Sequence, residues 1–421
     1  MFRRSLFIVL AVLIALSMTG FAPAGPTAPK GEETVAEMEA TWVEGTYAPD
    51  QVLVKFKTGA DAERIAADFD MTVERDTALG VKVLRAPAGA VKQAIAALRA
   101  NPAVEYAEPN GIATVFVDPN DTYYSTCYNT AFYGCVAQWN WPKIQANLAW
   151  DTVTGSANVK VAVLDTGIDN SHPDLPPVAL QKDFINNDNN AEDDFGHGTH
   201  VAGIIGALTN NNVGVAGANW NVSLMAGKVL DAWGSGSWES VANGIIWAAD
   251  NGANVINMSL GGSSSSTTLK NAVDYAWNKG VVIACSAGNN GTTTKTYPAS
   301  YTNCIAVAAT NKNDNKASFS SYGFTWVDVA APGDGVLSTM PNTSVTMNTY
   351  YGYKMNYDGV SGTSMAAPHV AGLAGLVWAS GKCTTASCVR SRIEKNSDKL
   401  PGTLLYWRYG RINAYKAVTA P

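Results

Sequence analysis

Charged residues, histidines and long apolar runs are all scarce in this chain of 421 residues. Asp, Glu, Lys and Arg make up 15% of it, and the formal net charge is −6. The basic residues form no block, so the sequence lacks the charge pattern of a nucleic-acid-binding protein. Beyond the N-terminus, no stretch reaches the roughly 18 apolar residues that suggest a membrane-spanning helix. We therefore expect no nucleic-acid partner, no membrane anchor in the mature protein, and a monomer.

The N-terminus carries the longest apolar run, which extends from residue 5 to residue 18 after two arginines. The run is short, and Ala-Pro-Ala at 22–24 resembles a small-x-small cleavage site, so residues 1–24 are predicted to be a signal peptide. Residues 25–48 are rich in Pro, Ala, Glu and Thr and are expected to form a linker. The sequence thus predicts a secreted, extracellular protein.

Six cysteines suit an oxidising compartment, and the lack of a Cys-x-x-Cys pair argues against a zinc site. Spacing predicts two disulfide bonds across short loops, Cys127–Cys135 and Cys383–Cys388. Cys285 and Cys304 fall at what the sequence indicates are neighbouring strand ends. That placement favours a third disulfide bond and leaves open two free thiols in the core.

Residues 49–116 are predicted to form a small separate domain. Strand-like and helical patterns alternate in the order β-α-β-β-α-β, with strands at 51–57, 71–73, 80–84 and 103–107 and helices at 60–69 and 90–100. This is the split β-α-β arrangement of a ferredoxin-like α+β domain. The segment contains no histidine and no cysteine, so it offers no catalytic constellation.

Residues 117–421 have less charge and more Gly, Asn and Ser. Apolar strands alternate with helical segments there, as at 159–164, 223–230, 255–260, 281–286 and 305–309. Such a pattern is typical of a mostly parallel sheet covered by helices on both faces, a three-layer αβα fold. In these folds functional side chains gather beyond the carboxyl ends of the strands.

Three segments of this domain carry Asp165, His197 and Ser364 in that order along the chain. Asp165 directly follows a strand, whereas His197 and Ser364 each precede a helix rich in small residues. A serine hydroxyl needs a neighbouring base, and that base needs an acceptor that fixes its tautomer. The three other histidines lie in a turn or inside a helix: His172, His200 and His369. His197 is therefore the predicted base, and Asn289, after another strand, is the predicted oxyanion donor.

Two other enzyme classes and one non-enzyme class share parts of this pattern. Leu-Asp-Thr-Gly at 164–167 also matches an aspartic-protease signature, but a second copy is missing. An α/β-hydrolase esterase would need Gly-x-Ser-x-Gly, which does not occur. A secreted pseudoprotease would keep the fold without the reaction, yet every triad and oxyanion residue is present.

Together, the segments around Asp165, His197 and Ser364 resemble those of the subtilisin-like serine proteases, most closely the thermitase group, over residues 117–418. The resemblance implies a serine endopeptidase in which Asp165, His197, Ser364 and Asn289 are catalytic. It also implies that a peptide substrate adds as a β-strand to Gly234, Ser235 and Gly236. Its P1 side chain, which precedes the cleaved bond, would enter a roomy apolar pocket and be large or aromatic, with broad tolerance. The implied pocket residues are Ser259, Leu260, Gly261 and Gly288.

The resemblance further implies structural Ca²⁺ and no catalytic cofactor. A tight site would take its oxygen ligands from Asp121, Asp174, Leu208, Asn211, Val213 and Val215. A second site would use Asp183, Asn186, Asp188, Asn190 and Glu192. There the sequence departs from the family pattern, because Asn186 stands where an aspartate is expected and Glu192 replaces an amide. A solvated Asn-rich turn remains the alternative for the first loop.

The 49–116 domain resembles the propeptides that act as intramolecular chaperones and inhibitors of such proteases. The implied partners are therefore protein and peptide substrates and the chain's own propeptide. Because the composition changes after residue 110, we expect the precursor to cut itself between Asn110 and Asp121.

Overall fold

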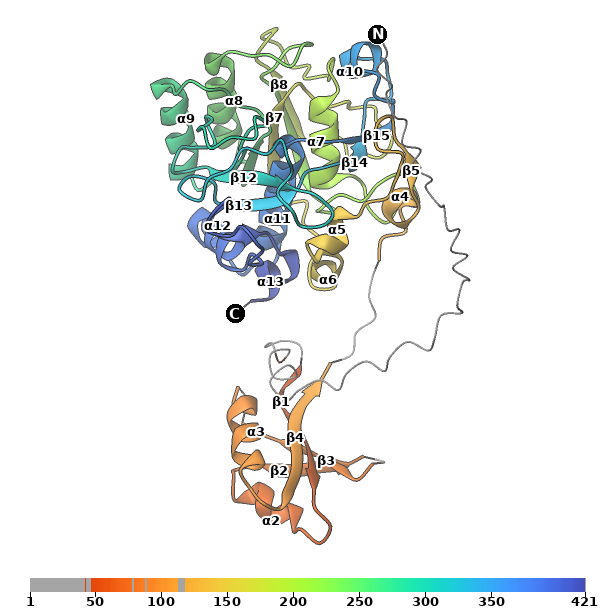
Figure 1. Ribbon diagram of the computed structural model, residues 1–421, viewed down its shortest axis with the longest axis vertical. Coiled ribbons are helices and arrows are strands. Elements are labelled where there is room, and N and C mark those ends of the chain that lie inside the picture. Colours follow the sequence, from red (N-terminus) through yellow and green to blue (C-terminus); the bar gives the residue numbers. More distant parts are fainter. Residues whose placement is uncertain (1–41, 43–46, 78, 88, 113–117, 421) are drawn as a thin grey trace, which may run out of the picture. The chain divides into compact units, whose positions relative to one another are not determined.

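The computed structural model describes residue 42 and residues 47–77, 79–87, 89–112 and 118–420. The predicted signal peptide and most of the predicted linker lie outside the described residues. The chain divides into two compact units, Met1–Ile112 and Ala113–Pro421, and each is described by itself (Figure 1).

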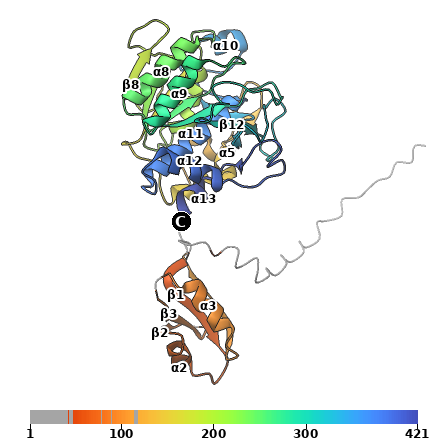
Figure 2. The ribbon, with the colours of Figure 1, turned by 90° about the vertical axis from the view of Figure 1, so that its left-hand side faces the viewer.

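Within its described residues, the N-terminal unit contains six elements in the order that the sequence predicts. They are β1 (Tyr47–Phe56), α2 (Ala62–Ala67), β2 (Thr72–Asp76), β3 (Val81–Arg85), α3 (Val91–Arg99) and β4 (Val104–Gly111). The sheet has the order β2-β3-β1-β4, and its neighbours are antiparallel. Figure 2 shows α3 lying along this sheet. Asp61 starts α2 by accepting a hydrogen bond from the N–H of Arg64, as a capping residue does.

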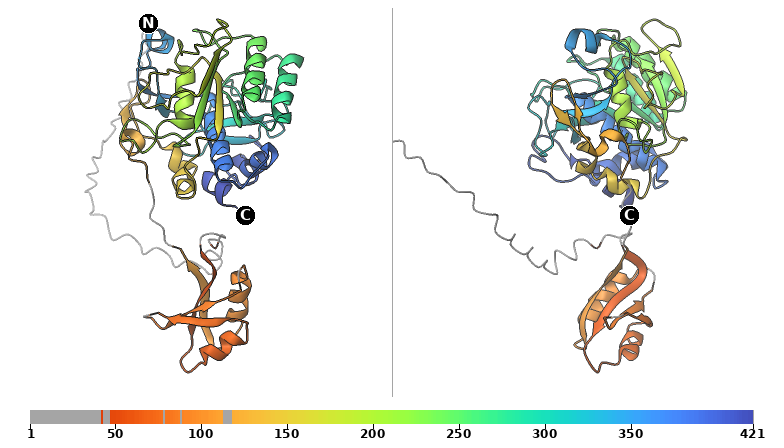
Figure 3. Two further views of the ribbon diagram at one scale, coloured as in Figure 1. Left: turned by 180° about the vertical axis from the view of Figure 1, so that it is seen from behind. Right: turned by 90° about the vertical axis from the view of Figure 1, so that its right-hand side faces the viewer.

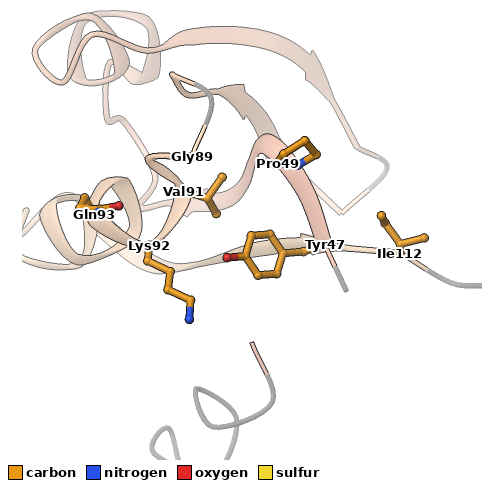
Figure 4. Close-up of a pocket in the computed structure, with 7 residues that line it drawn as sticks. All are labelled: Tyr47, Pro49, Gly89, Val91, Lys92, Gln93 and Ile112. Atoms are coloured by element: carbon orange, nitrogen blue, oxygen red, sulfur yellow. The ribbon is translucent and has the colours of Figure 1, made fainter. Parts of the chain in front are cut away.

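The core of this unit lies between the helices and one face of the sheet. Val52 and Val54 of β1 pack with Leu84 of β3 and with Ile95 and Leu98 of α3. A cavity of about 470 Å³ lies at the start of α3 (Figure 4) and is lined by Tyr47, Pro49, Gly89, Val91, Lys92, Gln93 and Ile112. Its lining has no histidine, cysteine or carboxylate, so this cavity offers no hydrolytic chemistry.

The C-terminal unit is built on an eight-stranded sheet of order β16-β13-β12-β11-β10-β7-β9-β8, in which every neighbouring pair is parallel. The strands are β7 (Lys160–Asp165), β8 (Leu180–Asp183), β9 (Ser223–Lys228), β10 (Val255–Met258), β11 (Val282–Ser286), β12 (Ile305–Thr310), β13 (Val329–Pro332) and β16 (Gly410–Arg411). The predicted parallel sheet is therefore confirmed.

Helices cover both faces of this sheet. Figure 1, and the left panel of Figure 3 from behind, show α8 (Trp238–Asp250) and α9 (Thr267–Asn278) on one side of the strands and α7 (His197–Gly206) on the other. Val161 and Val163 of β7 pack into the core on the α7 side, which also contains α11 (Thr363–Ala379), α12 (Ala386–Lys395) and α13 (Ala414–Thr419). Ala162 and Leu164 pack on the α8 side. Burial on both faces explains the continuous apolar strands.

Smaller elements surround this framework. They are α4 (Thr122–Ser125), β5 (Tyr128–Asn129), β6 (Cys135–Val136), α5 (Asn140–Lys143), α6 (Ala146–Trp150), β14 (Val336–Thr339), α10 (Thr346–Tyr351) and β15 (Tyr357–Val360). β5 pairs with β6, and β14 pairs with β15, both antiparallel. The β14–β15 pair and α10 lie shortly before α11 in the chain.

The cysteines follow the sequence prediction in two of three cases. Disulfide bonds join Cys127 to Cys135 and Cys383 to Cys388. The third disulfide bond, which the sequence favours, is not formed, because Cys285 and Cys304 are free and buried. Cys285 lies opposite Ala306 in the register of β11 and β12, and Cys304 directly precedes β12. The two thiols lie close enough to interact, because burial and then a hydrogen bond with Cys304 raise the pKa of Cys285. The alternative of two core thiols is the one that the structure has.

Candidate active site

Asp165 and His197 meet where β7 ends and α7 begins. Asp165 is the last residue of β7 and is fully buried. His197 is the first residue of α7, and Gly196 before it has φ 114°, a conformation that favours glycine. Nδ1 of His197 lies 2.7 Å from Oδ1 of Asp165. Because the carboxylate accepts the Nδ1 proton, it leaves Nε2 of His197 free to act as a base.

The surroundings of His197 tune its basicity. Burial lowers the pKa of His197, but the charge of Asp165 and the hydrogen bond to it outweigh burial, so that the net pKa is raised. A carboxylate that favours imidazolium in this way supports proton uptake from a nucleophile.

The other histidines have structural partners. Nε2 of His200 lies 3.1 Å from the carbonyl oxygens of both Val336 and Asp358, and burial lowers its pKa to about 3. Nδ1 of His369 lies 2.8 Å from the carbonyl of Met365, and burial lowers its pKa to about 4. Burial also lowers the pKa of His172. All three are therefore neutral at neutral pH, in line with the selection of His197 as the base.

Ser364 is the second residue of α11, which starts after Gly362. Its hydroxyl donates to the carbonyl of Ser259 at 3.1 Å, while the hydroxyl of Ser259 donates to the carbonyl of Ser364 at 2.7 Å. This double contact fixes the start of α11 against the segment that follows β10. To pass its proton to His197, the hydroxyl of Ser364 would have to turn away from Ser259, and catalytic hydrogen bonds are often completed only in the complex with substrate.

Asn289 has a side chain of fixed orientation. Its Oδ1 accepts hydrogen bonds from the N–H of Thr363 at 2.8 Å and from the hydroxyl of Thr363 at 2.9 Å. With the oxygen held, Nδ2 remains the donating end of the amide. A Cβ atom on Gly362 would lie 3.5 Å from that Nδ2, so the amide is at the start of α11, beside Ser364. Thr363 is a positioning residue that the sequence did not reveal, although it immediately precedes the predicted nucleophile.

A second set of residues missed by the sequence reasoning supports the loop before α7. The carboxylate of Asp193, which is buried, accepts from the hydroxyls of Thr166 and Thr199 and from the N–H of Gly196. Nζ of Lys228, also buried, donates to the carbonyl of Thr166 and to Asp194. These bonds connect the end of β7 to the start of α7. The signal in the sequence was the pair of acidic residues four and three positions before His197.

A cleft of about 650 Å³ opens beside His197. Six of the seven predicted substrate-binding residues line it: Gly234, Ser235, Gly236, Ser259, Leu260 and Gly261. Phe195, Leu230, Trp233 and Trp238 line it as well. Gly288 is not part of this lining; it has φ +97°, and a Cβ atom there would lie 2.9 Å from Thr296. The cleft thus combines a glycine-rich backbone edge with apolar walls.

The residues of the predicted tight calcium site also come together. Oδ2 of Asp121 accepts from the N–H of Asn210 at 2.8 Å, and its Oδ1 is buried without a hydrogen-bond partner. Oδ1 of Asp174 accepts from the amide of Asn211 at 2.9 Å, and Oδ2 accepts from the N–H of Val215 at 2.8 Å. Burial, with a contribution from the charge on Asp121, raises the pKa of Asp174 to about 7. An unpartnered buried oxygen beside a second buried carboxylate is a setting that fits a hard cation.

The residues of the second predicted calcium site form a turn whose carboxylates accept hydrogen bonds from groups of the same turn. The carboxylate of Asp183 accepts from the N–H groups of Ile185 and Asn186 and from the amide of Asn186. Oδ1 of Asp188 accepts from the N–H of Asn190. The pKa of Glu192 is raised by burial and then by the charge of Asp169, so this carboxyl faces Asp169. Among the described residues, no cluster of three or more His, Cys, Asp or Glu side chains is placed to hold a metal.

Comparisons with known proteins agree with this arrangement. A model of the subtilase family, peptidase S8, matches residues 156–411, and a model of the fervidolysin N-terminal prodomain matches residues 34–110. The chain is 42% identical to a thermophilic serine proteinase of Bacillus sp. (strain AK1) over 98% of both chains. It is 49% identical to thermitase of Thermoactinomyces vulgaris over 71% of this chain and 99% of that protein.

The fold is also that of a solved protease. The structure of a protease from Pseudoalteromonas arctica PAMC 21717 superposes with a TM-score of 0.64 at 34% identity, covering 72% of this chain and 99% of the other. In the part of the chain that the structure describes, no helix has the length and apolarity needed to cross a membrane. The parallel sheet, the paired Asp165 and His197 and the matched family together lead to one conclusion: the chain belongs to the subtilase family and is a subtilisin-like serine protease with an N-terminal prodomain.

Proposed function

We propose that the chain is a secreted, calcium-stabilised serine endopeptidase, made as a precursor that cuts itself. Asp165, His197 and Ser364 are its triad, and Asn289 is its oxyanion donor. The observation that carries this proposal is the 2.7 Å contact between His197 and Asp165, which leaves Nε2 of His197 free to act as a base.

The reaction follows from these groups. Nε2 of His197 takes the proton of the Ser364 hydroxyl as Oγ attacks the carbonyl carbon of the peptide bond. The negative charge that forms on the carbonyl oxygen accepts hydrogen bonds from Nδ2 of Asn289 and the N–H of Ser364, whose position in the first turn of α11 leaves that N–H without an intrahelical partner. His197 then returns the proton to the leaving amine, and water releases the acyl group by the same steps. Asp165 supports the imidazolium throughout.

Substrate would bind as an added strand along Gly234, Ser235 and Gly236, whose backbone lines the cleft. The lining by Ser259, Leu260 and Gly261 favours a large apolar or aromatic P1 side chain. Gly288, which does not line the cleft, stays a prediction for the opposite wall of the P1 pocket.

The reaction class can be tested with a chromogenic peptide that has phenylalanine at P1. We expect hydrolysis that a serine-reactive organofluoride abolishes, with one label bound at Ser364. A chelator added briefly at low temperature should leave the rate unchanged. Hydrolysis that survives complete labelling of Ser364 would overturn the assignment of the nucleophile.

Calcium in the first site would be held by the carboxylates of Asp121 and Asp174, the side chain of Asn211 and the carbonyls of Leu208, Val213 and Val215. Bound there, the ion would supply structural stabilisation. The buried, unpartnered Oδ1 of Asp121 supports this proposal. The second site, at Asp183, Asn186, Asp188, Asn190 and Glu192, remains a prediction, and its internally bonded turn would have to open in part.

Calcium removal tests both sites, since an ion that binds only the folded state stabilises it by about 2.7 kcal/mol at a concentration 100 times its Kd. For a domain of this size we expect a chelator to lower the Tm by about 5–10 °C. The measurement uses an inhibited enzyme, so that self-digestion does not contribute. Asp174→Asn should abolish most of this response, whereas Asp250→Asn, a matched variant of a surface carboxylate outside both sites, should keep it. An equal response in wild type and Asp174→Asn would exclude the first site.

The N-terminal unit would act as propeptide, with its last strand leading toward the predicted cut between Asn110 and Asp121. Residues 113–117 of this window lie outside the described residues. Support comes from the prodomain match over residues 34–110 and from the division of the chain after Ile112.

A further inference from the structure

A group of exposed aromatic rings lies beside the cleft, outside the residues that the sequence assigned to substrate. Trp233, Tyr350 and Tyr351 have exposed fractions of 59%, 71% and 53%. Trp233 directly precedes the Gly234–Gly236 edge, and the two tyrosines end α10. Grouped exposed rings of this kind often mark a binding surface.

These rings form one connected surface, here called the aromatic wall and defined as Phe195, Trp233, Tyr350 and Tyr351. The ring centroids of Trp233 and Tyr350 are 5.2 Å apart, and those of Phe195 and Tyr351 are 6.2 Å apart. A Cβ atom on Gly234 would lie 3.3 Å from the ring of Phe195. The wall therefore joins α10 to the substrate edge, although its members lie far apart in sequence.

Backbone hydrogen bonds hold α10 beside the catalytic histidine. The N–H of Met347 donates to the carbonyl of Phe195 at 2.9 Å, and the N–H of Thr346 donates to the carbonyl of Asp194 at 3.3 Å. Phe195 is two residues before His197. The wall is thus fixed to the segment that leads into α7 and is not a separate surface feature.

The aromatic wall lies on the side of the cleft to which the P2 side chain of a bound peptide would point. Successive side chains of an extended peptide point to opposite sides. If P1 turns toward Ser259, Leu260 and Gly261, the preceding residue, P2, turns to the other side of the cleft. Phe195, Leu230 and Trp233 lie with His197 in the lining of that same cleft.

The polar groups near the wall are already engaged. Oδ1 of Asp231 accepts from the N–H groups of Trp233 and Ser235. Asp194 pairs with the buried Nζ of Lys228. Phe195, Leu230 and Trp233 give a P2 side chain an apolar surface to contact, and burying an apolar group against those side chains removes both surfaces from water.

We propose that the aromatic wall selects a large apolar or aromatic side chain at P2 of the substrate, with Trp233 as the main contact and Tyr350 as its support. The proposal rests on the proposed function, because it names a preference of the same cleft. It adds a specificity determinant that depends on α10.

The test uses tetrapeptide p-nitroanilides with phenylalanine at P1 and Gly, Ala, Leu, Phe or Asp at P2. In the wild-type enzyme we expect kcat/KM to be about tenfold higher for Phe than for Ala at P2, the lower range for an apolar pocket. Asp at P2 should be the poorest substrate. Equal kcat/KM values for Gly, Ala and Phe at P2 would overturn the proposal.

Variants then assign the preference to the wall. Trp233→Ala should reduce the Phe-to-Ala ratio to about twofold, Tyr350→Ala should reduce it partly, and Trp233→Phe should retain most of it. Phe324→Ala is the control, because that ring is 46% exposed but does not line the cleft; it should leave the ratio unchanged. The readout is a ratio on one enzyme preparation, so a loss of folded protein cancels. An unchanged ratio in Trp233→Ala would refute the role of the wall.

Failure of this proposal differs from failure of the proposed function. If the proposed function is wrong, no peptide of the series is hydrolysed, and the organofluoride does not label Ser364. If only the wall is misassigned, labelling and hydrolysis persist, and the P2 preference alone is missing.

Discussion

The antiparallel sheet of the N-terminal unit and the parallel sheet of the C-terminal unit bury their strands in different ways. In β1, only Tyr47, Val52 and Val54 are buried. In β10, β11 and β12 every residue is buried. A sheet with one free face keeps a surface for contact, whereas a sheet covered on both faces leaves only its strand ends open.

The distribution of chemistry follows that difference. All four histidines belong to the C-terminal unit, and Asp165 ends the strand β7. The covered sheet thus offers fixed strand ends on which catalytic side chains can be placed, whereas the half-covered sheet of the prodomain keeps a surface suited to contact with another part of the chain. A parallel sheet also needs long crossover connections, which slow folding, so a template would serve the larger unit more than the smaller one.

The largest expected effect comes from Ser364→Ala, in which the chain between the N-terminal and C-terminal units should remain uncut. We expect the precursor to accumulate uncut and peptide hydrolysis to fall about a millionfold, the size of loss known for this change in a member of the same family. N-terminal sequencing and mass measurement of the expressed protein show whether the two units are still joined. Cys304→Ala serves as a control for a buried residue outside the site. Maturation of Ser364→Ala without added protease would contradict the role of Ser364.

A smaller effect is expected at the oxyanion donor. Asn289→Ala should lower kcat about 10²–10³-fold with little change in KM, because one hydrogen bond to the transition state is lost; this range was measured for the corresponding donor in a related enzyme. Cleavage between the two units should slow by a similar factor. Thr363→Val removes the hydroxyl that holds Oδ1 of Asn289 and should lower kcat less. A kcat for Asn289→Ala equal to that of wild type would exclude this donor.

The smallest expected effect concerns stability in acid. The free energy of unfolding of the C-terminal unit should fall with pH, whereas that of the N-terminal unit should not. Burial lowers the pKa of His200 to about 3, whereas an unfolded histidine titrates near 6.5. Below that pH the unfolded chain binds more protons, so this stability is fully present above about 6.5 and is lost as pH falls toward the folded pKa. At pH 5 we expect His200 alone to reduce the free energy of unfolding by about 2 kcal/mol.

The N-terminal unit has no histidine and should show no such loss in this pH window. Urea unfolding of the Ser364→Ala precursor between pH 7.5 and 5, followed by tryptophan fluorescence and hydrogen exchange of each unit, makes the comparison. His200→Gln is a matched variant that should flatten the pH dependence of the larger unit. Equal acid sensitivity of both units would contradict this explanation.

Much of the fold was predictable because the sequence patterns are strong. The alternation of apolar strands and helices predicted the parallel sheet, and the β-α-β-β-α-β order of the first unit was also correct. The third disulfide bond was wrongly favoured. The sequence correctly indicated that Cys285 and Cys304 are neighbours, but the two thiols interact without being bonded, and that difference depends on side-chain geometry that spacing does not specify. The sequence pattern indicated the glycine-rich segment at 234–236. It gave no sign that the rings of the aromatic wall lie beside that segment.

The sequence by itself determined which residues are the candidates for a triad, their order, and the elements that carry them. These features are local, since a strand end or a helix start is specified by a few neighbouring residues. Only the tertiary structure decided how Thr363 orients Asn289, how Asp193 fixes the start of α7, and how Tyr350 reaches Trp233. Most of those contacts join residues that lie far apart along the chain, and Asp193 accepts from Thr166, 27 positions earlier, as well as from the nearby Gly196. Their geometry depends on packing that no local pattern records.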